Sequence, residues 1–215
     1  MTTLAIETST AQGSVAVSSS GEILFLETFI AARSHGSALF AVLERARGEV
    51  LHIDQIVVGL GPGSYAGIRI AIAAALGLEL GLGAKLVGIP SIAALDASVA
   101  HYLVVGDARR DSFYFAAVDG GVCSDGPRLA TEDEVRAATE SFGTWPLYAA
   151  EPVPRFHTAT IAAPSAPILA RQAAEQRGIV QSDSLEPIYL REPQITTARR
   201  SPVMLRPSKP ARWFE

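Results

Sequence analysis

One stretch constrains the fold of this chain more than any other: a short β-branched run enters a glycine-rich turn, and the turn opens into an apolar helix. It reads Ile56-Val57-Val58-Gly59-Leu60-Gly61-Pro62-Gly63-Ser64-Tyr65-Ala66-Gly67-Ile68-Arg69-Ile70. Its glycines let the backbone approach another group closely. Ser64 is a favourable N-cap, which places Tyr65 in the first turn of the helix. Such a turn either binds an anion at the helix N-terminus or joins two closely packed elements.

Three roles for this glycine-rich turn are conceivable, and each requires particular residues in or near it. A phosphate-binding P-loop requires a lysine, and the turn has none. A dinucleotide fingerprint, G-x-G-x-x-[GA], is satisfied from Gly61 to Ala66, but it also requires an acid about 20 residues on, after the next strand. That strand, residues 85–89, ends in Pro90-Ser91, and the nearby acid Glu79 lies inside the helix. The third interpretation, a tight structural connection, is favoured by the rest of the chain.

The first half of the chain has the pattern of a strand meander followed by alternating helices and strands. Strands are predicted at residues 4–8, 14–18 and 23–29, followed by a helix from Ser34 to Gly48. Then come the strand at 55–59, the helix to about Gly81, and the strand at 86–89. A third helix is expected from Ser91 to about Ala100. This alternation predicts an α/β fold.

The second half repeats this order weakly. A strand at 102–107 ends in Asp107, as the first strand ends near Glu7, and a strand at 111–118 follows. Helices are expected from Thr131 and from 164 to 177, with short strands at 147–149 and 158–161. We interpret this as an internal duplication. It predicts an N-terminal lobe at 1–100, a smaller degenerate lobe at 101–195 and a Pro/Arg-rich tail at 196–215.

Composition places the chain among globular proteins. Hydrophobic residues make up 48% and charged residues 19%, with a net charge of -4. This charge argues against a chain coated in nucleic acid. The single cysteine, Cys123, fits a reducing compartment. The N-terminus does not read as a secretory signal, and the apolar run at 70–84 is shorter than a typical membrane span. We therefore expect a soluble, cytoplasmic protein with no membrane partner.

The C-terminal tail differs in composition from the rest. Between residues 199 and 215 it carries one acid, three prolines and five basic residues: Arg199, Arg200, Arg206, Lys209 and Arg212. Prolines at this density prevent a regular helix, so we expect a mobile tail. A solvated terminus and an arm that touches RNA both fit this composition.

The order of elements resembles the duplicated ribonuclease-H-like fold of the actin, hexokinase and heat-shock ATPase superfamily, with two lobes and a degenerate second lobe. Four segments are more specific, and together they resemble the bacterial TsaB family. They are residues 4–9 (LAIETS), 61–70 (GPGSYAGIRI), 107–110 (DARR) and 189–191 (YLR). The resemblance covers residues 4–191. Glu7 departs from it, because these proteins usually carry Asp at this position.

This resemblance implies a non-catalytic scaffold in the formation of threonylcarbamoyladenosine beside the anticodon of tRNA. The chain would bind and activate a TsaD-like transferase paralogue as a heterodimer, with a TsaE-like ATPase in the complex and only indirect contact with tRNA. No cofactor would be required, although weak binding of ATP, ADP or Mg²⁺ is compatible with the fold. In this reading no residue of the chain is catalytic.

The residues themselves offer little chemistry. The histidines His35, His52, His101 and His157 include no pair at helical metal-ligand spacing, so we expect no metal site. Glu7, Thr8, Ser9 and Asp107 form a possible vestigial nucleotide site, in which Glu7 and Asp107 face each other across a cleft. These carboxylates would hold Mg²⁺ or simply hydrogen-bond nearby backbone. The alternatives are a free-standing ATP-dependent kinase or transferase, and an M22-type metallopeptidase, which lacks its metal ligands here.

The helix after the glycine turn is apolar nearly all round, with only Arg69 and Glu79 charged. A helix that covers one sheet face normally has a polar outer side. We therefore predict a partner interface at Ile70, Ala71, Ala74, Gly77 and Leu78. In the absence of the transferase, the same surface would form a symmetric homodimer.

Overall fold

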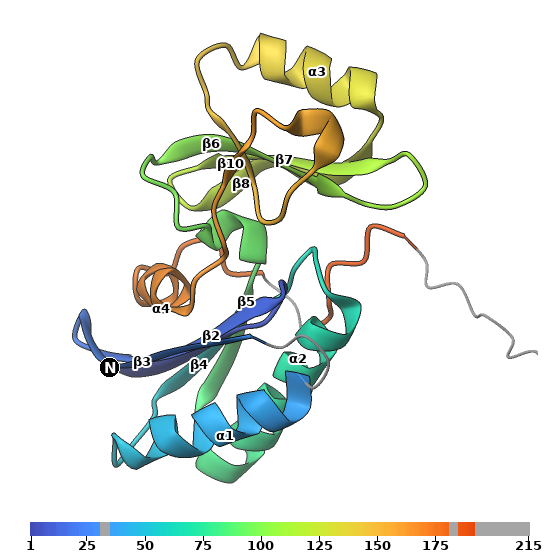
Figure 1. Cartoon of the computed structure of the whole chain (residues 1–215). Helices are drawn as coiled ribbons and strands as arrows, with labels where there is room; N and C mark the ends of the chain where they lie inside the picture. Colours follow the sequence, from blue (N-terminus) through green and yellow to red (C-terminus); the bar gives the residue numbers. More distant parts are fainter. Residues whose placement is uncertain (31–34, 181–184, 192–215) are drawn as a thin grey trace, which may run out of the picture.

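Two five-stranded sheets form the centres of two stacked lobes (Figure 1). The computed structural model describes residues 1–30, 35–180 and 185–191. The first lobe contains β1 (Thr2–Glu7), β2 (Gln12–Ser19), β3 (Glu22–Ile30), α1 (His35–Gly48), β4 (Gln55–Gly59), α2 (Tyr65–Leu82) and β5 (Lys85–Ile89). Its sheet has the order β3-β2-β1-β4-β5. The first three strands are antiparallel, and β4 and β5 run parallel to β1.

The second lobe repeats this topology. It contains β6 (His101–Asp107), β7 (Phe113–Asp119), β8 (Val122–Ala130), α3 (Glu132–Ser141), β9 (Leu147–Ala149), η2 (Pro154–Phe156) and β10 (Thr160–Ile161). Its order is β8-β7-β6-β9-β10, with the same strand directions as the first sheet. The predicted α/β fold with an internal duplication is therefore confirmed. The second copy is degenerate because the three-residue η2 stands where the first copy has the 18-residue α2.

Helices cover both faces of the first sheet. α1 and α2 lie on the face away from the second lobe, and α4 (Ala166–Ala174) covers the other face (Figure 1). Leu169 of α4 is buried with Ala5, Ala16 and Val57 of the first sheet. The amide of Ala166 also donates a hydrogen bond of 3.0 Å to Ser14 Oγ. The helix α4 therefore packs on the first sheet, although it follows the strands of the second sheet along the chain.

Local sequence explains how the main helices begin and end. Ser64 Oγ accepts the amide of Gly67 at the start of α2, and Gly83, with φ of 65°, ends the helix by donating to the Glu79 carbonyl at 2.8 Å. A positive φ suits glycine at this position. At the start of α3, Thr131 and Glu134 form a reciprocal capping box.

The structure differs from the predicted elements in two places. The helix expected from Ser91 to Ala100 is only a short 3-10 turn, η1 (Ser91–Ala94), because the chain becomes extended at Leu95, bridges to Pro164 and crosses to the second lobe. β8 was not predicted, since Asp125, Gly126 and Pro127 in its middle have the composition of a turn. The Ser34 N-cap and the tail lie outside the described residues.

Among the described residues, one helix, α2, is long and apolar enough by length and composition to cross a membrane. It is not a membrane span, because it packs on the first sheet. Its residues Ile68, Ala71, Ile72, Ala74 and Ala75 are buried in the core together with strand residues such as Leu4 and Val58.

Candidate functional site

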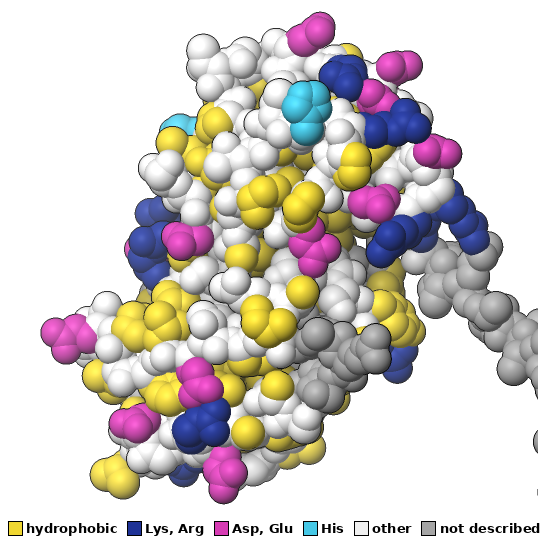
Figure 2. All heavy atoms as spheres, in the orientation of Figure 1, with side chains coloured by type: hydrophobic (Ala, Val, Ile, Leu, Met, Phe, Trp, Pro, Cys, Tyr) yellow, Lys and Arg dark blue, Asp and Glu magenta, His cyan; other side chains and the backbone are white. Residues whose placement is uncertain are grey.

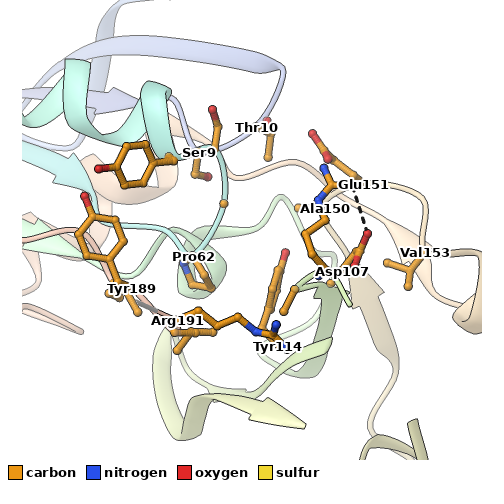
Figure 3. Close-up of a pocket in the computed structure, with 18 of the residues that line it drawn as sticks. Ser9, Thr10, Pro62, Asp107, Tyr114, Ala150, Glu151, Val153, Tyr189 and Arg191 are labelled. Carbon is orange, nitrogen blue, oxygen red and sulfur yellow. Dashed lines mark hydrogen bonds and ion pairs between the residues drawn. The ribbon is translucent and has the colours of Figure 1, made fainter. Parts of the chain in front are cut away.

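A cleft of about 710 Å³ separates the two lobes (Figure 3). The first lobe lines it with Ser9 and Thr10 after β1 and with residues 62–65 of the glycine turn. The second lobe contributes Asp107 at the end of β6 and Glu151 after β9. Because the sheets share one topology, corresponding strand ends face each other here. The Ala11 amide also donates to Glu151 Oε1 at 3.4 Å and so bridges the two lobes.

The glycine turn is docked tightly onto the loop after β1. The Ser64 amide donates to the Ser9 carbonyl at 2.6 Å, and Thr8 Oγ1 donates to the Gly67 carbonyl at 2.9 Å. A β-carbon on Gly63 would lie 2.2 Å from the Ser9 carbonyl oxygen, so only glycine fits. The amides of Ser64 and Gly67, which an anion at this helix N-terminus would need as donors, are thus already bound to protein oxygens. This geometry favours the structural interpretation of the glycine stretch.

Glu7 lies behind this turn, fully buried. Its Oε1 accepts the Ser9 amide at 2.6 Å, whereas Oε2 has no hydrogen-bond partner among the described residues. A β-carbon on Gly59 would lie 1.9 Å from Glu7 Oε2 and 2.6 Å from Ser91 Oγ. Burial raises the pKa of the Glu7 carboxyl, and the hydrogen bond from Ser9 together with the nearby Ser91 hydroxyl offsets only part of this. The environment therefore favours the neutral carboxylic acid.

On the other side of the cleft, the turn after β6 has an unusual backbone. Arg109, Arg110 and Asp111 all have positive φ, between 54° and 66°. The Arg109 amide donates to Asp107 Oδ1 at 2.7 Å, and its guanidinium pairs with Oδ2 at 3.5 Å. Arg155 pairs with Asp111 at 3.3 Å. These contacts hold a conformation that non-glycine residues rarely adopt and that often occurs at functional sites.

Tyr114 forms part of the cleft floor. Its ring packs on Gly106, where a β-carbon would come within 2.0 Å of the ring. Burial, with Glu151 and Asp107 nearby, raises the pKa of the Tyr114 hydroxyl to about 12. Tyr114 is therefore a neutral hydrogen-bonding group at physiological pH.

The mouth of the cleft carries a second aromatic group. The rings of Tyr65 and Tyr189 lie 5.4 Å apart, and Tyr65 and Tyr189 are 47% and 44% exposed. The Arg69 guanidinium lies 5.1 Å from the Tyr65 ring centroid and donates to the Tyr65 hydroxyl. Arg191 also lines the cleft, and its buried Nε has no partner among the described residues.

The structure brings together only part of the predicted nucleotide site. Ser9 and Asp107 line the cleft, but Glu7 and Thr8 do not. The expectation that Glu7 faces Asp107 across the cleft is wrong, because Ser9 and the glycine turn cover the Glu7 carboxyl. The acids that do line the cleft are Asp107 and Glu151, and the described residues contain no cluster of three or more potential metal ligands. Nucleotide or Mg²⁺ binding stays a prediction.

Sequence reasoning assigned no role to Glu151 or Tyr114. Nothing in the local pattern marks Glu151, which follows a three-residue strand. The position of Tyr114 opposite Gly106 in the β6–β7 pair is the signal that could have identified it, but this requires the strand register.

The predicted partner-interface residues on α2 divide between two sides of the helix. Ala71 is fully buried and Ala74 is 6% exposed, both in the core of this chain. Ile70 and Leu78 are half-buried, and Gly77 is exposed. A partner can therefore reach Ile70, Gly77 and Leu78, but Ala71 and Ala74 must be removed from the prediction.

The exposed face of α2 is a different stripe of residues. Ala66, Arg69, Ala73, Leu76 and Leu80 recur at helical spacing and all are exposed. We name this set the α2 stripe. It contains one charge, and Leu80 is 87% exposed. The sequence pattern alone could not predict which face of α2 is exposed, because the helix is apolar on every side.

Comparison with known proteins identifies the family. A family model described as "TsaD: tRNA N6-adenosine threonylcarbamoyltransferase" matches residues 29–142, more than half of the chain. The chain belongs to the TsaD family. Two relatives of similar length are uncharacterized proteins of Mycobacterium bovis and Mycobacterium tuberculosis. Each is 30% identical over 203 residues, covering 89% of this chain and 92% of the relative.

Solved structures place this TsaD-family chain beside YeaZ, also named TsaB. A Pseudomonas aeruginosa protein described as similar to the peptidase YeaZ has a TM-score of 0.71 at 23% identity, covering 88% of this chain and 99% of its own. The structure of YeaZ from the same organism gives 0.64 at 24% identity with the same coverage. These identities show a shared fold. The family match places the chain in a tRNA-modification family, and the two structures show that it has the fold of YeaZ, in agreement with the resemblance seen in the sequence.

Proposed function

We propose that this chain is a non-catalytic subunit that binds and activates a TsaD-like transferase, which forms threonylcarbamoyladenosine next to the anticodon of tRNA. The proposal includes a heterodimer with the transferase, a TsaE-like ATPase in the complex, a homodimer when the chain is alone, and a cytoplasmic location. The chain itself requires no cofactor, and any binding of ATP, ADP or Mg²⁺ is weak.

The observation that carries this proposal is the α2 stripe. Soluble monomers rarely expose a continuous apolar surface without a function for it. Four of the five residues of the stripe are apolar, and they follow one face of an 18-residue helix. The neighbouring α1 exposes Phe40 as well. By contrast, the outer side of α3 carries charged residues such as Asp133 and Arg136.

Small residues make the stripe suited to helix packing. Ala66 and Ala73, with the adjacent exposed Gly77, let a second backbone come close, while Leu76 and Leu80 supply apolar area. Helix faces of this kind pack with interaxial distances of 8–10 Å, the shorter ones where side chains are small. A paralogue with the same fold would present an equivalent helix, so the pairing would be pseudo-symmetric.

The cleft supports the non-catalytic part of the proposal. In a free-standing kinase of this fold, the acid at the end of β1 would have to reach the phosphate site. Here Glu7 is covered by Ser9 and the glycine turn, and its surroundings favour the neutral form.

The test is reconstitution with the cognate transferase paralogue, comparing Ala73→Glu in the stripe with Ala137→Glu on the exposed side of α3. A charge at the centre of the interface should abolish association in sedimentation and reduce threonylcarbamoyladenosine formation to the level of transferase alone. Ala137→Glu should behave as wild type. Normal association of a folded Ala73→Glu variant would refute the interface. Hydrolysis of many ATP molecules per chain, by the chain alone with Mg²⁺, would instead support a free-standing enzyme.

A further inference from the structure

The outer strand β3 of the first sheet has a backbone edge that is available for pairing. β3 is the terminal strand in the order β3-β2-β1-β4-β5, and no strand of the described ranges lies on its other side. Along such a strand, alternate residues direct their N–H and C=O groups away from the sheet, where a further strand can bind them. Figure 2 shows hydrophobic side chains on the lower lobe at the place where Figure 1 draws β3.

The edge strand carries exposed apolar side chains on the face of the sheet that α4 covers elsewhere. Leu26 lies opposite Ala16 of β2, and Ala16 is buried together with Leu169 of α4. Leu26 itself is 51% exposed, and Ile23 and Leu24 are 45% and 47% exposed. The first sheet therefore has an apolar margin beside α4 that the described part of the chain leaves half open.

The other face of β3 is anchored on the first lobe. Phe25 and Phe29 pack against the core, and a β-carbon on Gly13 would lie 2.5 Å from the Phe29 ring. Between them, the Glu27 carboxylate accepts two hydrogen bonds, of 2.9 and 2.6 Å, from Arg45 of α1. The extended backbone of β3 is thus already ordered, so pairing with another strand costs it little conformational entropy.

The internal duplication provides a comparison, because β8 has the same place in the second sheet. Both strands have nine residues and both are terminal. The middle of β8 is Asp-Gly-Pro-Arg at residues 125–128, and its pairing with β7 shifts register at two places. Proline, charge and irregular pairing are features that prevent natural sheet edges from pairing with other chains. The edge of the second sheet is therefore protected.

The edge of the first sheet lacks most of this protection. The β3 sequence, EILFLETFI, contains no proline, lysine or arginine. Its register with β2 shifts once, near the start of the strand, and the part from Phe25 to Ile30 pairs regularly. Of its two acids, Glu22 lies at the first position and Glu27 is paired with Arg45. A long, apolar and regular edge of this kind is a template for another strand.

The residues of β3 fit a second copy of the same strand. Two identical antiparallel strands are related by a two-fold axis, so the contact is self-complementary. With the axis at Leu26 or at Thr28, Glu27 lies opposite a phenylalanine of the second copy, either Phe25 or Phe29. Like charges therefore do not meet directly across the pair. The apolar side chains of both copies lie on one face, where they cover each other.

We propose that β3 is a docking strand for β3 of a second copy of this chain, paired antiparallel so that the two five-stranded sheets become one continuous sheet. This goes beyond the proposed function, because it gives the chain a self-association surface apart from the α2 stripe. α2 packs on β1, β4 and β5, whereas β3 is at the opposite edge of the sheet. An extended segment of a different protein is the competing occupant, and it would leave this edge unpaired in the isolated chain.

The test is sedimentation equilibrium of the full chain in an Ala73→Glu background, which removes self-association through the α2 stripe. The Ala73→Glu chain should still form a dimer. Adding Leu26→Lys should raise the dimer dissociation constant at least about tenfold, since two like charges then lie near the two-fold axis. Adding Leu129→Lys, at an exposed leucine of the other edge strand β8, should leave the constant unchanged. A monomeric Ala73→Glu chain, or unweakened dimerisation with Leu26→Lys, would overturn the proposal.

Cross-linking tests the same pairing without a disruptive charge. The chain has a single cysteine, so Cys123→Ala gives a background without thiols. Directly opposite residues of an antiparallel pair lie close enough for a disulfide, and a residue on a two-fold axis lies opposite itself. Leu26→Cys or Thr28→Cys should therefore give a cross-linked dimer under mild oxidation, and Leu129→Cys should stay monomeric. An equal yield from Leu129→Cys would indicate random collision and overturn the proposal.

Transferase association, measured separately, distinguishes this proposal from the proposed function. Leu26→Lys should bind the transferase as wild type does, because it lies outside the α2 stripe. Loss of the transferase from a folded Leu26→Lys variant would make β3 a transferase contact and overturn the self-pairing. If the Ala73→Glu chain keeps the transferase and still dimerises through β3, the α2 interface fails while this proposal stands.

Discussion

A β-carbon on Gly59 would lie 1.9 Å from Oε2 of Glu7, so the buried carboxyl occupies the space that any other residue at position 59 would need. Glu7 ends β1 and Gly59 ends β4, the parallel strand beside it. The glycine that precedes the turn is thus required by a side chain 52 positions earlier, and the pair fixes how the turn sits on the sheet.

Gly59→Ala should destabilise the protein by about 1–3 kcal/mol, the usual cost of forcing extra atoms into a packed site. Urea denaturation measures this difference in the free energy of unfolding. Because the methyl group clashes mainly with the Glu7 carboxyl, Gly59→Ala should cost less in a Glu7→Ala background. Strict additivity in this double-mutant cycle would show that the two residues do not compete for space.

Glu7→Gln should change how stability depends on pH. The pKa of Glu7 is raised in the folded protein, so the folded state holds its proton to higher pH than the unfolded chain does. Wild-type stability is therefore full below the ordinary glutamate pKa of 4.5 and falls as pH rises through the folded pKa. Glutamine has no such loss, so the difference in free energy of unfolding, variant minus wild type, should grow with pH. A difference independent of pH would contradict the buried neutral acid.

The same Glu7→Gln variant should retain threonylcarbamoyladenosine formation close to wild type when reconstituted with the transferase. The carboxyl does not line the cleft, so it cannot contact a ligand there. A single-turnover assay with tRNA measures this. Loss of activity to background in a variant with a native circular dichroism spectrum would assign a chemical role to Glu7.

Ala74→Glu should destabilise the protein strongly and Ala73→Glu hardly at all, although the two residues are neighbours. Ala74 is buried in the core of the first lobe, so a carboxylate there is an unpaired buried charge that costs several kcal/mol. Ala73 is exposed on the α2 stripe, and glutamate is well tolerated on an exposed helix face. Thermal melts followed by circular dichroism should show a large loss of Tm only for Ala74→Glu. Similar melts for the pair would mean that α2 is rotated from this orientation.

Deletion of residues 199–215 should leave both folding and transferase binding intact. The segment is rich in proline and charge and has little apolar area to bury. Circular dichroism and sedimentation with the transferase measure the two properties. A truncated chain that no longer folds would show that the tail completes the core.

Local sequence determined most of the elements and their order. The strand at residues 55–59, the glycine turn and the helix after it follow from β-branched residues, glycines and the Ser64 N-cap, all of which act within a few residues. The repeated order of strand, turn and strand indicated the duplication, because each copy needs the same hydrophobic alternation to form its meander. The strand β8 was missed because a strand that contains Gly126 and Pro127 is stabilised by its neighbour β7 and not by its own composition.

Only the tertiary structure decided which surfaces face the core, the cleft and the solvent. α2 is apolar on every side, so its sequence could not show that Ala74 faces the sheet while Ala73 faces outward. That choice is made by packing against β4 and α1. The cleft likewise joins Ser9, Glu151 and Tyr189, which are far apart in sequence and carry no shared pattern. The burial of Glu7 depends on Gly59, Ser9 and Ser91 closing around it, since a residue's environment is set by contacts across strands and not by its neighbours along the chain.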